Sequence, residues 1–361
     1  MRSRWPSADR QTRKATLIAV IASACTNFDA LGPSPEPLPA DNPGQVIPGL
    51  ENGSAFAWNP VSGRLIVPVY LGNRSFSIVS VDPQTRAVKA LVGQTSGLFR
   101  QLSIAASTGT TFYSFDDASG ASNSRLLRRV PLDGGSSESV STPRPVTGSF
   151  LVSPEGTHLL FASSTTEWTL TDLVSGEEVG TREVSVPRAV GPGGNEVIVQ
   201  YPTARAVNFS TGVVRELAPL GYLAHAAWVD GGWRALWVLP PFGERQAFTA
   251  YEWDEAAGTT RTLGSVTARP SGSTFCAGWS PSTHSAVIMA DSISSGGFIG
   301  AYYVHHTIAT VSGGVAKTIG SANLEGEGAP PCALSPDGKH FAYSGAREFL
   351  GGSAVFLKET K

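Results

Sequence analysis

The sequence predicts an all-β fold built from repeated four-stranded sheets, and three observations carry this prediction. Glycine and proline are frequent, with 40 and 25 copies among 361 residues, which indicates many turns and few long helices. No stretch shows sustained helical periodicity between capping residues. One strand–turn–strand phrase recurs along most of the chain, and an internal repeat of this kind is typical of a ring or solenoid architecture.

The repeated phrase is an apolar strand, a turn of the Ser-Pro-x-Gly type and a second apolar strand, clearest in Phe150–Phe161 and Cys332–Tyr343. Proline presets φ at the second position of a turn, and glycine accepts positive φ near its end. The steps between copies, 38 to 55 residues, bracket the length of a propeller blade, and seven copies predict a seven-bladed β-propeller of four-stranded blades. The last apolar residue of each first strand marks the copies: Trp58, Ala105, Val152, Val190, Trp228, Trp279 and Leu334.

Closure of the ring needs a strand from the other end of the chain. The seventh repeat supplies three strands between residues 332 and 358, and a missing fourth strand would leave the blade with an exposed edge. Residues 45–50 precede the first repeat and are apolar enough to fill that edge. Pro48 is tolerated in an edge strand but not in a central one. We therefore expect the last blade to be closed by an N-terminal strand.

The N-terminal segment has the pattern of a secretory signal. Residues 1–14 carry five basic side chains against one Asp, and the apolar run Ala15–Ala24 follows. Ten apolar residues are too few to span a bilayer, which needs about 20, so residues 1–24 are predicted to be a signal peptide. Ala22–Cys25 resembles a bacterial lipobox, although Ala22 stands where leucine is usual.

The lipobox pattern predicts a lipid on Cys25, a proline-rich tether over 25–44 and a propeller over 45–361. The protein is then an extracytoplasmic, membrane-anchored lipoprotein of the periplasm or outer membrane. Cleavage after Ala24 without lipidation, giving a secreted protein, is one alternative. A cytoplasmic protein is the other.

The Ser-Pro-Asp-Gly turns, framed by tryptophan or aliphatic residues, resemble the WD40-like repeats of TolB-type propellers. The resemblance covers residues 53–361 and is strongest in the third, sixth and seventh repeats. It implies the propeller architecture and an extracytoplasmic location. TolB carries a further domain ahead of its propeller, and the residues before 45 are too few to form one, so the resemblance implies no TolB partner.

Cys276 and Cys332 are predicted to form a disulfide between the sixth and seventh blades. In the repeat alignment the two cysteines are offset by one strand position. Side chains alternate between the faces of a strand, so the offset aims the thiols at the two faces that pack together. An oxidising compartment permits the bond, and two buried free thiols are the alternative.

Motifs for chemistry are missing from the sequence. It contains no G-x-S-x-G, H-E-x-x-H or P-loop pattern, and its net charge of −2 is unsuited to nucleic acid. His305 and His306 are adjacent, so in a strand they point to opposite faces and do not converge on one ion. We predict no catalytic residue, no metal and no cofactor.

Long connections on one face of the ring are the expected place of function, because a rigid scaffold carries binding residues on its loops. We expect these loops at Asp116–Asn123, Pro240–Gln246, Asp291–Gly297 and Ser344–Gly352. An arginine beside an exposed aromatic residue is typical of an interface anchor. The candidate binding residues are Asp116, Asp117, Phe242, Arg245, Asp291, Arg347 and Phe349.

The predicted function is that of a monomeric, non-catalytic binding or scaffold propeller, engaging an envelope protein or glycan through these loops. Two alternatives belong to other classes. One is an extracytoplasmic propeller enzyme, either a lactonase or a glycan-acting hydrolase with polar residues at the centre of the ring. The other is a carbohydrate-binding module.

Overall fold

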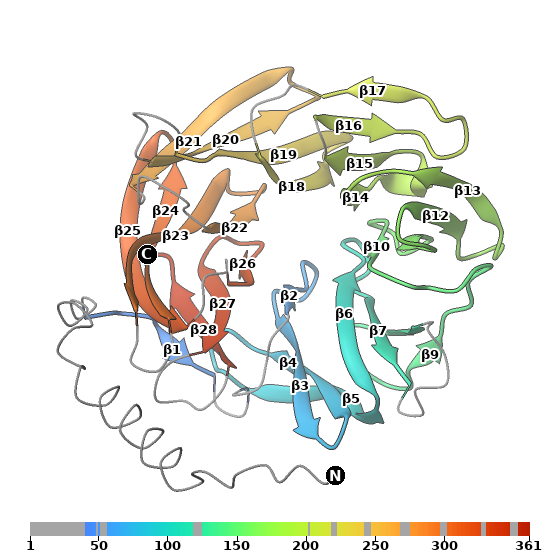
Figure 1. The fold of residues 1–361 in the computed structure, drawn as a ribbon, viewed down its shortest axis with the longest axis horizontal. Helices are drawn as coiled ribbons and strands as arrows, with labels where there is room; N and C mark the ends of the chain where they lie inside the picture. Colours follow the sequence, from blue (N-terminus) through green and yellow to red (C-terminus); the bar gives the residue numbers. More distant parts are fainter. Residues whose placement is uncertain are drawn as a thin grey trace, which may run out of the picture.

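Seven four-stranded antiparallel sheets form a closed ring in the computed structural model (Figure 1). The prediction of a seven-bladed β-propeller is thereby confirmed. The structure describes residues 40–47, 50, 56–117, 125–200, 203–217, 222–241, 247–267, 275–296, 302–325, 330–346 and 353–361. The predicted signal peptide, Cys25 and all but the end of the tether lie outside this part of the chain.

The blades follow one another in chain order, and within each of the first six the strands run from the centre of the ring outwards. Blade 1 contains β2 (Ala57–Trp58), β3 (Leu65–Gly72), β4 (Ser75–Val81) and β5 (Val88–Ser96). Blade 2 contains β6 (Leu98–Ile104), β7 (Thr111–Asp116), β8 (Leu126–Val130) and β9 (Glu138–Ser139). Blade 3 contains β10 (Phe150–Val152), β11 (His158–Ala162), β12 (Glu167–Asp172) and β13 (Glu178–Glu183). Blade 4 contains β14 (Pro187–Val190), β15 (Val197–Gln200), β16 (Ala204–Val207) and β17 (Val214–Glu216). Blade 5 contains β18 (Tyr222–Val229), β19 (Gly232–Leu239), β20 (Ala247–Asp254) and β21 (Thr259–Thr267). Blade 6 contains β22 (Phe275–Ser280), β23 (Ser285–Gly296), β24 (Tyr302–Ser312) and β25 (Val315–Glu325). Blade 7 contains β26 (Cys332–Leu334), β27 (His340–Ala346), β28 (Ser353–Glu359) and, on its outer edge, β1 (Gln45–Val46).

The ring is closed by the N-terminal strand, as the repeat count predicts. Gln45 and Val46 of β1 pair with Leu357 and Phe356 of β28. The Ile47 amide extends this pairing by donating to the Val355 carbonyl at 3.1 Å. Pro48 lies outside the described residues. The outer edge of the last blade is thus held by a segment from the opposite end of the sequence.

The Ser-Pro-x-Gly phrase forms the turn between the first two strands of a blade for a local reason. In blade 7 the Ser335 hydroxyl accepts the amide of His340 at 2.9 Å, and in blade 3 Ser153 accepts the amide of His158 at 3.1 Å. The turn glycines, Gly338 and Gly156, have φ of +69° and +74°, a conformation that strains any residue with a Cβ. The repeated residues therefore specify one turn geometry.

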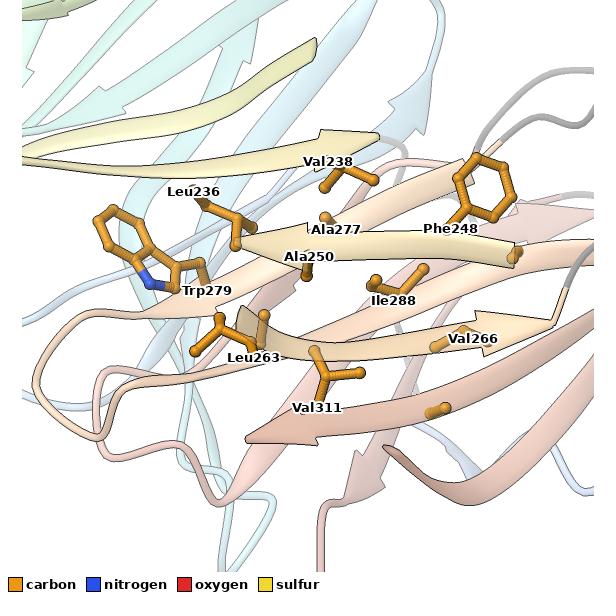
Figure 2. Close-up of a cluster of buried hydrophobic side chains, with 13 residues drawn as sticks. Leu236, Val238, Phe248, Ala250, Leu263, Val266, Ala277, Trp279, Ile288 and Val311 are labelled. Atoms are coloured by element: carbon orange, nitrogen blue, oxygen red, sulfur yellow. The ribbon is translucent and has the colours of Figure 1, made fainter. Parts of the chain in front are cut away.

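The hydrophobic core is divided among the interfaces between neighbouring blades. Figure 2 shows the interface between blades 5 and 6, where Val238 and Phe248 of blade 5 belong to one buried cluster with Ile288 and Val311 of blade 6. Similar buried clusters lie between the other pairs of blades. Apart from a three-residue 3-10 turn at Pro192–Gly194, the described residues form no helix, and none of them forms a helix that could cross a membrane.

A disulfide joins Cys276 of β22 to Cys332 of β26, with the Cα atoms 6.0 Å apart. Cys276 lies opposite Met289 in its sheet, and Cys332 lies opposite Tyr343. All four side chains belong to the cluster between blades 6 and 7. The one-position offset therefore places the two sulfur atoms in the same interface.

Candidate functional site

One face of the ring carries the connections between second and third strands together with those between blades, and we call it the loop face. Of the seven predicted binding residues, the structure describes Asp116, Asp117 and Asp291. Asp116 is the last residue of β7, and Asp117 is exposed immediately after it. The other four, Phe242, Arg245, Arg347 and Phe349, lie outside the described residues.

Asp291 does not lie in a loop, so the expectation of a long loop at Asp291–Gly297 is wrong over its described part. The residue is 6% exposed and belongs to β23, which continues to Gly296 and pairs with β24. The Tyr302–Val304 stretch of β24 is rich in strand-forming residues, and its pairing extends β23 beyond the apolar run at its start. Asp291 is therefore not available on the loop face as predicted.

The carboxylate of Asp116 is occupied by arginines of its own blade. Arg100 donates to it through Nε at 2.7 Å and also through a second guanidinium nitrogen. The hydrogen bond to Asp116 raises the pKa of Arg100. Arg125 Nε lies 3.9 Å from the same carboxylate, while Arg125 Nη1 donates to the Gly148 carbonyl at 2.7 Å. Asp116 thus positions two guanidinium groups on blade 2.

Asp116 and Asp291 do not share a site. They belong to blades 2 and 6, with blades 7 and 1 between them in the ring. The described candidate residues therefore do not form one cluster.

A group at the inner end of the loop face was missed by the sequence reasoning. Arg188 of β14 donates to the Gln200 side-chain oxygen at 2.9 Å and to the Tyr222 hydroxyl at 2.7 Å. Its guanidinium carbon also lies 5.1 Å from the centroid of the Tyr222 ring. Tyr222 packs edge-to-face against Phe275 with ring centroids 5.7 Å apart. We call Arg188, Gln200, Tyr222 and Phe275 the Arg188–Tyr222 platform.

The platform combines an exposed aromatic ring with the Arg188 guanidinium, whose described partners are the neutral side chains of Gln200 and Tyr222. Tyr222 is 42% exposed although it lies on an innermost strand. Arg188, Tyr222 and Phe275 lie at or next to the first residues of β14, β18 and β22, the innermost strands of blades 4, 5 and 6. These strands start on the loop face. Aligning the first residue of each innermost strand across the repeats, and not only the last apolar residue, would have pointed to these positions in the sequence.

Below the platform, His225 connects blades 5 and 6. Its Nε2 lies 2.5 Å from the carbonyl oxygen of Ala277 on the neighbouring innermost strand. Burial lowers the pKa of His225, and the positive charge of Arg188 lowers it further. The imidazole is therefore neutral near pH 7 and donates a hydrogen bond, which supports the platform from the core side.

His305 and His306 occupy opposite faces of β24, as the alternation predicts. His305 Nδ1 lies 2.6 Å from Asn323 Oδ1, whereas His306 lies opposite Asp291 in the sheet and is 1% exposed. Burial, with the nearby His305, lowers the pKa of His306 to about 4. In the part of the chain that the structure describes, no three His, Cys, Asp or Glu side chains are grouped to hold a metal ion.

Comparisons with known proteins support the fold. No protein-family model and no curated protein matches this chain. An oligogalacturonate lyase in complex with manganese has a TM-score of 0.57 and 11% identity, covering 91% of this chain and 99% of its own. The Cps50 (Swd1) β-propeller domain of Myceliophteria thermophila has a TM-score of 0.54 and 12% identity, covering 89% and 100%. The C-terminal WD40 domain of Sif2 has a TM-score of 0.53 and 10% identity, covering 89% and 99%.

This chain is thus similar in fold both to an enzyme and to WD40 propellers. At such identities the likeness carries the propeller architecture alone, since one fold hosts many functions.

Proposed function

We propose that this protein is a non-catalytic binding propeller of the bacterial cell envelope that captures a partner on its loop face. The observation that carries the proposal is the Arg188–Tyr222 platform. Tyrosine and arginine are among the residues that most often dominate binding energy at interfaces, because they combine large contact area with directed hydrogen bonds. The exposure of Tyr222, at 42%, leaves that contact area open in the free protein.

The rigidity of the ring supports a scaffold role. The closing strand β1 and the disulfide between Cys276 and Cys332 both restrain the last blade. A preorganised surface binds more tightly than a mobile one, because less conformational entropy is lost on association.

Affinity capture from envelope extracts of the native host tests this role. We expect a defined partner to be retained by the wild-type protein and lost, by more than about tenfold, when Arg188→Ala and Tyr222→Ala are combined, since hot-spot truncations cost about 2 kcal/mol or more each. Val174→Ala is the matched control, because Val174 is 81% exposed on the opposite face. Equal capture by all three proteins, with unchanged melting temperatures, would reject the platform as the binding surface.

The four predicted loop residues outside the described part, Phe242, Arg245, Arg347 and Phe349, are proposed to extend this surface. Replacing all four with alanine is expected to abolish capture without unfolding the ring. Unchanged capture would restrict the surface to the platform.

Anchoring through Cys25, in the manner of an extracytoplasmic lipoprotein, is the second part of the proposal. It rests on the basic segment, the short apolar run and the Ala22–Cys25 pattern. We expect metabolic labelling with a palmitate analogue to mark the wild-type protein and not Cys25→Ser, which should appear in the soluble fraction. Labelling of Cys25→Ser, or membrane retention of it, would contradict the anchor.

An enzyme acting on an acidic glycan is the second candidate. The favouring observation is the Arg188 guanidinium, which has no described carboxylate partner and can attract a sugar acid, together with a fold similar to that of an oligogalacturonate lyase. Incubation of the purified protein with oligogalacturonate, with and without manganese, followed by absorbance of unsaturated products, distinguishes this candidate from the binding role.

A further inference from the structure

A cavity on the outer rim of blade 2 lies apart from the Arg188–Tyr222 platform. Its volume is about 430 Å³, which falls within the range of small-molecule sites. Strand β8 forms one wall, and residues 140–146, which connect blade 2 to blade 3, form the other. We call residues 140–146 the arch.

The arch is held open by its own contacts. It leaves β8 where the Val140 amide donates to the Leu127 carbonyl at 2.9 Å, and it returns where the Arg125 amide donates to the Val146 carbonyl at 2.8 Å. Between these points the Thr142 hydroxyl donates to the Arg144 carbonyl at 2.8 Å. The cavity therefore exists before any ligand arrives.

A paired charge fixes the crest of the arch to blade 3. Both oxygens of Glu178 on β13 accept hydrogen bonds from Arg144, at 2.8 and 3.1 Å. Pro143 and Pro145 flank this arginine, and the proline ring restricts φ on each side. Because the Arg144 charge is paired with Glu178, we assign Arg144 a structural role in holding the arch against blade 3.

Arg128 is the cation that the cavity leaves unused. The described lining contains Arg125, Arg128 and Arg144 and no acidic residue. Arg125 donates to the Gly148 carbonyl and lies near Asp116. The backbone of Arg128 pairs with Tyr113 and Ser139, but its side chain has no ion pair or hydrogen bond to a described residue. Its guanidinium carbon lies 5.8 Å from the centroid of the Phe115 ring, which supports the group without using its five donors.

We propose that this cavity binds a sugar acid, with Arg128 receiving the carboxylate. A planar guanidinium matches a carboxylate through two parallel hydrogen bonds. Ser139, the last residue of β9, provides a hydroxyl group beside the start of the arch, and the Thr142 hydroxyl, whose proton is donated to Arg144, can still accept a hydrogen bond. Leu126, which is 43% exposed, provides apolar surface for the C–H face of a pyranose ring.

An extended peptide fits the cavity less well than a sugar acid. Peptides that add to a sheet need a free edge, and the edge of β8 is already bonded to Val140 and Val146 at the two ends of the opening. Only the side chains that line the cavity can therefore contact a ligand, which favours a compact one.

Calorimetric titration of the folded protein with glucuronate tests the proposal, with glucose and inorganic phosphate as comparison ligands. We expect glucuronate to bind saturably with a dissociation constant below about 10 mM, and glucose and phosphate to bind more weakly. Arg128→Gln should reduce the affinity about tenfold or more, because hydrogen bonds to charged groups contribute about 1.5–3 kcal/mol. Arg128→Lys should recover only part of it, since lysine keeps the charge and loses the paired geometry.

Arg129→Gln is the matched control. Arg129 is the neighbouring residue of the same strand, points to the other face and pairs with Glu138 at 3.0 Å. Its replacement should leave the glucuronate affinity within about twofold of wild type. Variants of the platform should also leave it unchanged, so that failure of this site and failure of the proposed function are distinguishable.

Three results would overturn the inference. One is the lack of glucuronate binding by a wild-type protein that shows a normal melting transition. Another is equal binding of glucose, or tighter binding of phosphate, because either assigns the cavity to other chemistry. The third is an equal loss of affinity in Arg128→Gln and Arg129→Gln at unchanged melting temperature.

Discussion

The indole N–H of Trp279 in blade 6 donates to the buried carboxylate of Glu252 in blade 5, at 3.2 Å. The Glu252 side chain is fully buried and also contacts His284 Nδ1 at 2.7 Å and Arg261 Nε at 3.3 Å. The tryptophan at the equivalent repeat position in blade 1, Trp58, donates to the Ala333 carbonyl of blade 7 at 3.1 Å. At these positions the tryptophan joins neighbouring blades by a hydrogen bond as well as by packing.

Loss of the Glu252 carboxylate is expected to destabilise the ring. Glu252→Ala leaves the buried indole N–H of Trp279 without its acceptor, and an unsatisfied buried donor costs about 1–3 kcal/mol. Glu252→Gln keeps an acceptor and should cost less. Urea denaturation measures both. Glu216→Ala is the control, since Glu216 is 71% exposed in its pair with Arg205 and should change stability by less than about 1 kcal/mol. Equal effects of Glu252→Ala and Glu216→Ala would contradict the network.

The closing segment is expected to stabilise the whole ring. Ile47 is 1% exposed in the cluster between blades 7 and 1, so Ile47→Ala should lower the free energy of unfolding by about 2–5 kcal/mol. Deletion of residues 45–50 should lower the melting temperature by many degrees. Val174→Ala, at a site that is 81% exposed, should change it little. A deletion variant that melts at the wild-type temperature would show that β1 does not close the ring in solution.

Reduction of the disulfide is expected to lower stability by about 4 kcal/mol, since the bond closes a sequence separation of 56 residues. The urea midpoint of the wild-type protein should fall on addition of dithiothreitol. The double variant Cys276→Ala/Cys332→Ala, already without the bond, should show no response to the reductant. A response of equal size in both proteins would mean that the reductant acts elsewhere.

Acid should destabilise the protein through His306. The unfolded imidazole titrates near 6.5 and the native one at about 4, because burial disfavours its charged form. At pH values well above 6.5 His306 is neutral in both the folded and the unfolded state, and its contribution to the free energy of unfolding is fully present. Between pH 6.5 and 4 the unfolded state binds the proton first, so stability is lost by up to about 3 kcal/mol.

His306→Gln removes this titration. Thermal unfolding from pH 8 to 4 should show a smaller acid-side loss for the variant than for wild type, while the difference between the two proteins stays constant from pH 7 to 8. Parallel curves across the whole range would contradict the assignment to His306. Other buried histidines, such as His225, whose pKa is also lowered, contribute equally to both curves.

The functional groups were harder to predict than the ring. Asp291 was expected in a long loop over Asp291–Gly297, yet pairing with β24 continues β23 to Gly296. Arg188 and Tyr222 are 34 residues apart and meet because blades 4 and 5 place their innermost strands side by side. Arg128 gives no signal in the sequence, since the cavity beside it depends on how the arch leaves β8.

The amino-acid sequence alone determined the number of blades, the Ser-Pro-x-Gly turns and the closing strand, because each depends on local turn chemistry, strand alternation and the spacing of one repeated phrase. Tertiary structure decided which charges are neutralised and which remain available. Arg128 and Arg129 are consecutive, but among the residues that the structure describes only Arg129 pairs with a carboxylate, that of Glu138. Such pairings join residues from different strands and blades, so they are set by the curvature and register of the assembled ring and not by neighbours in the chain.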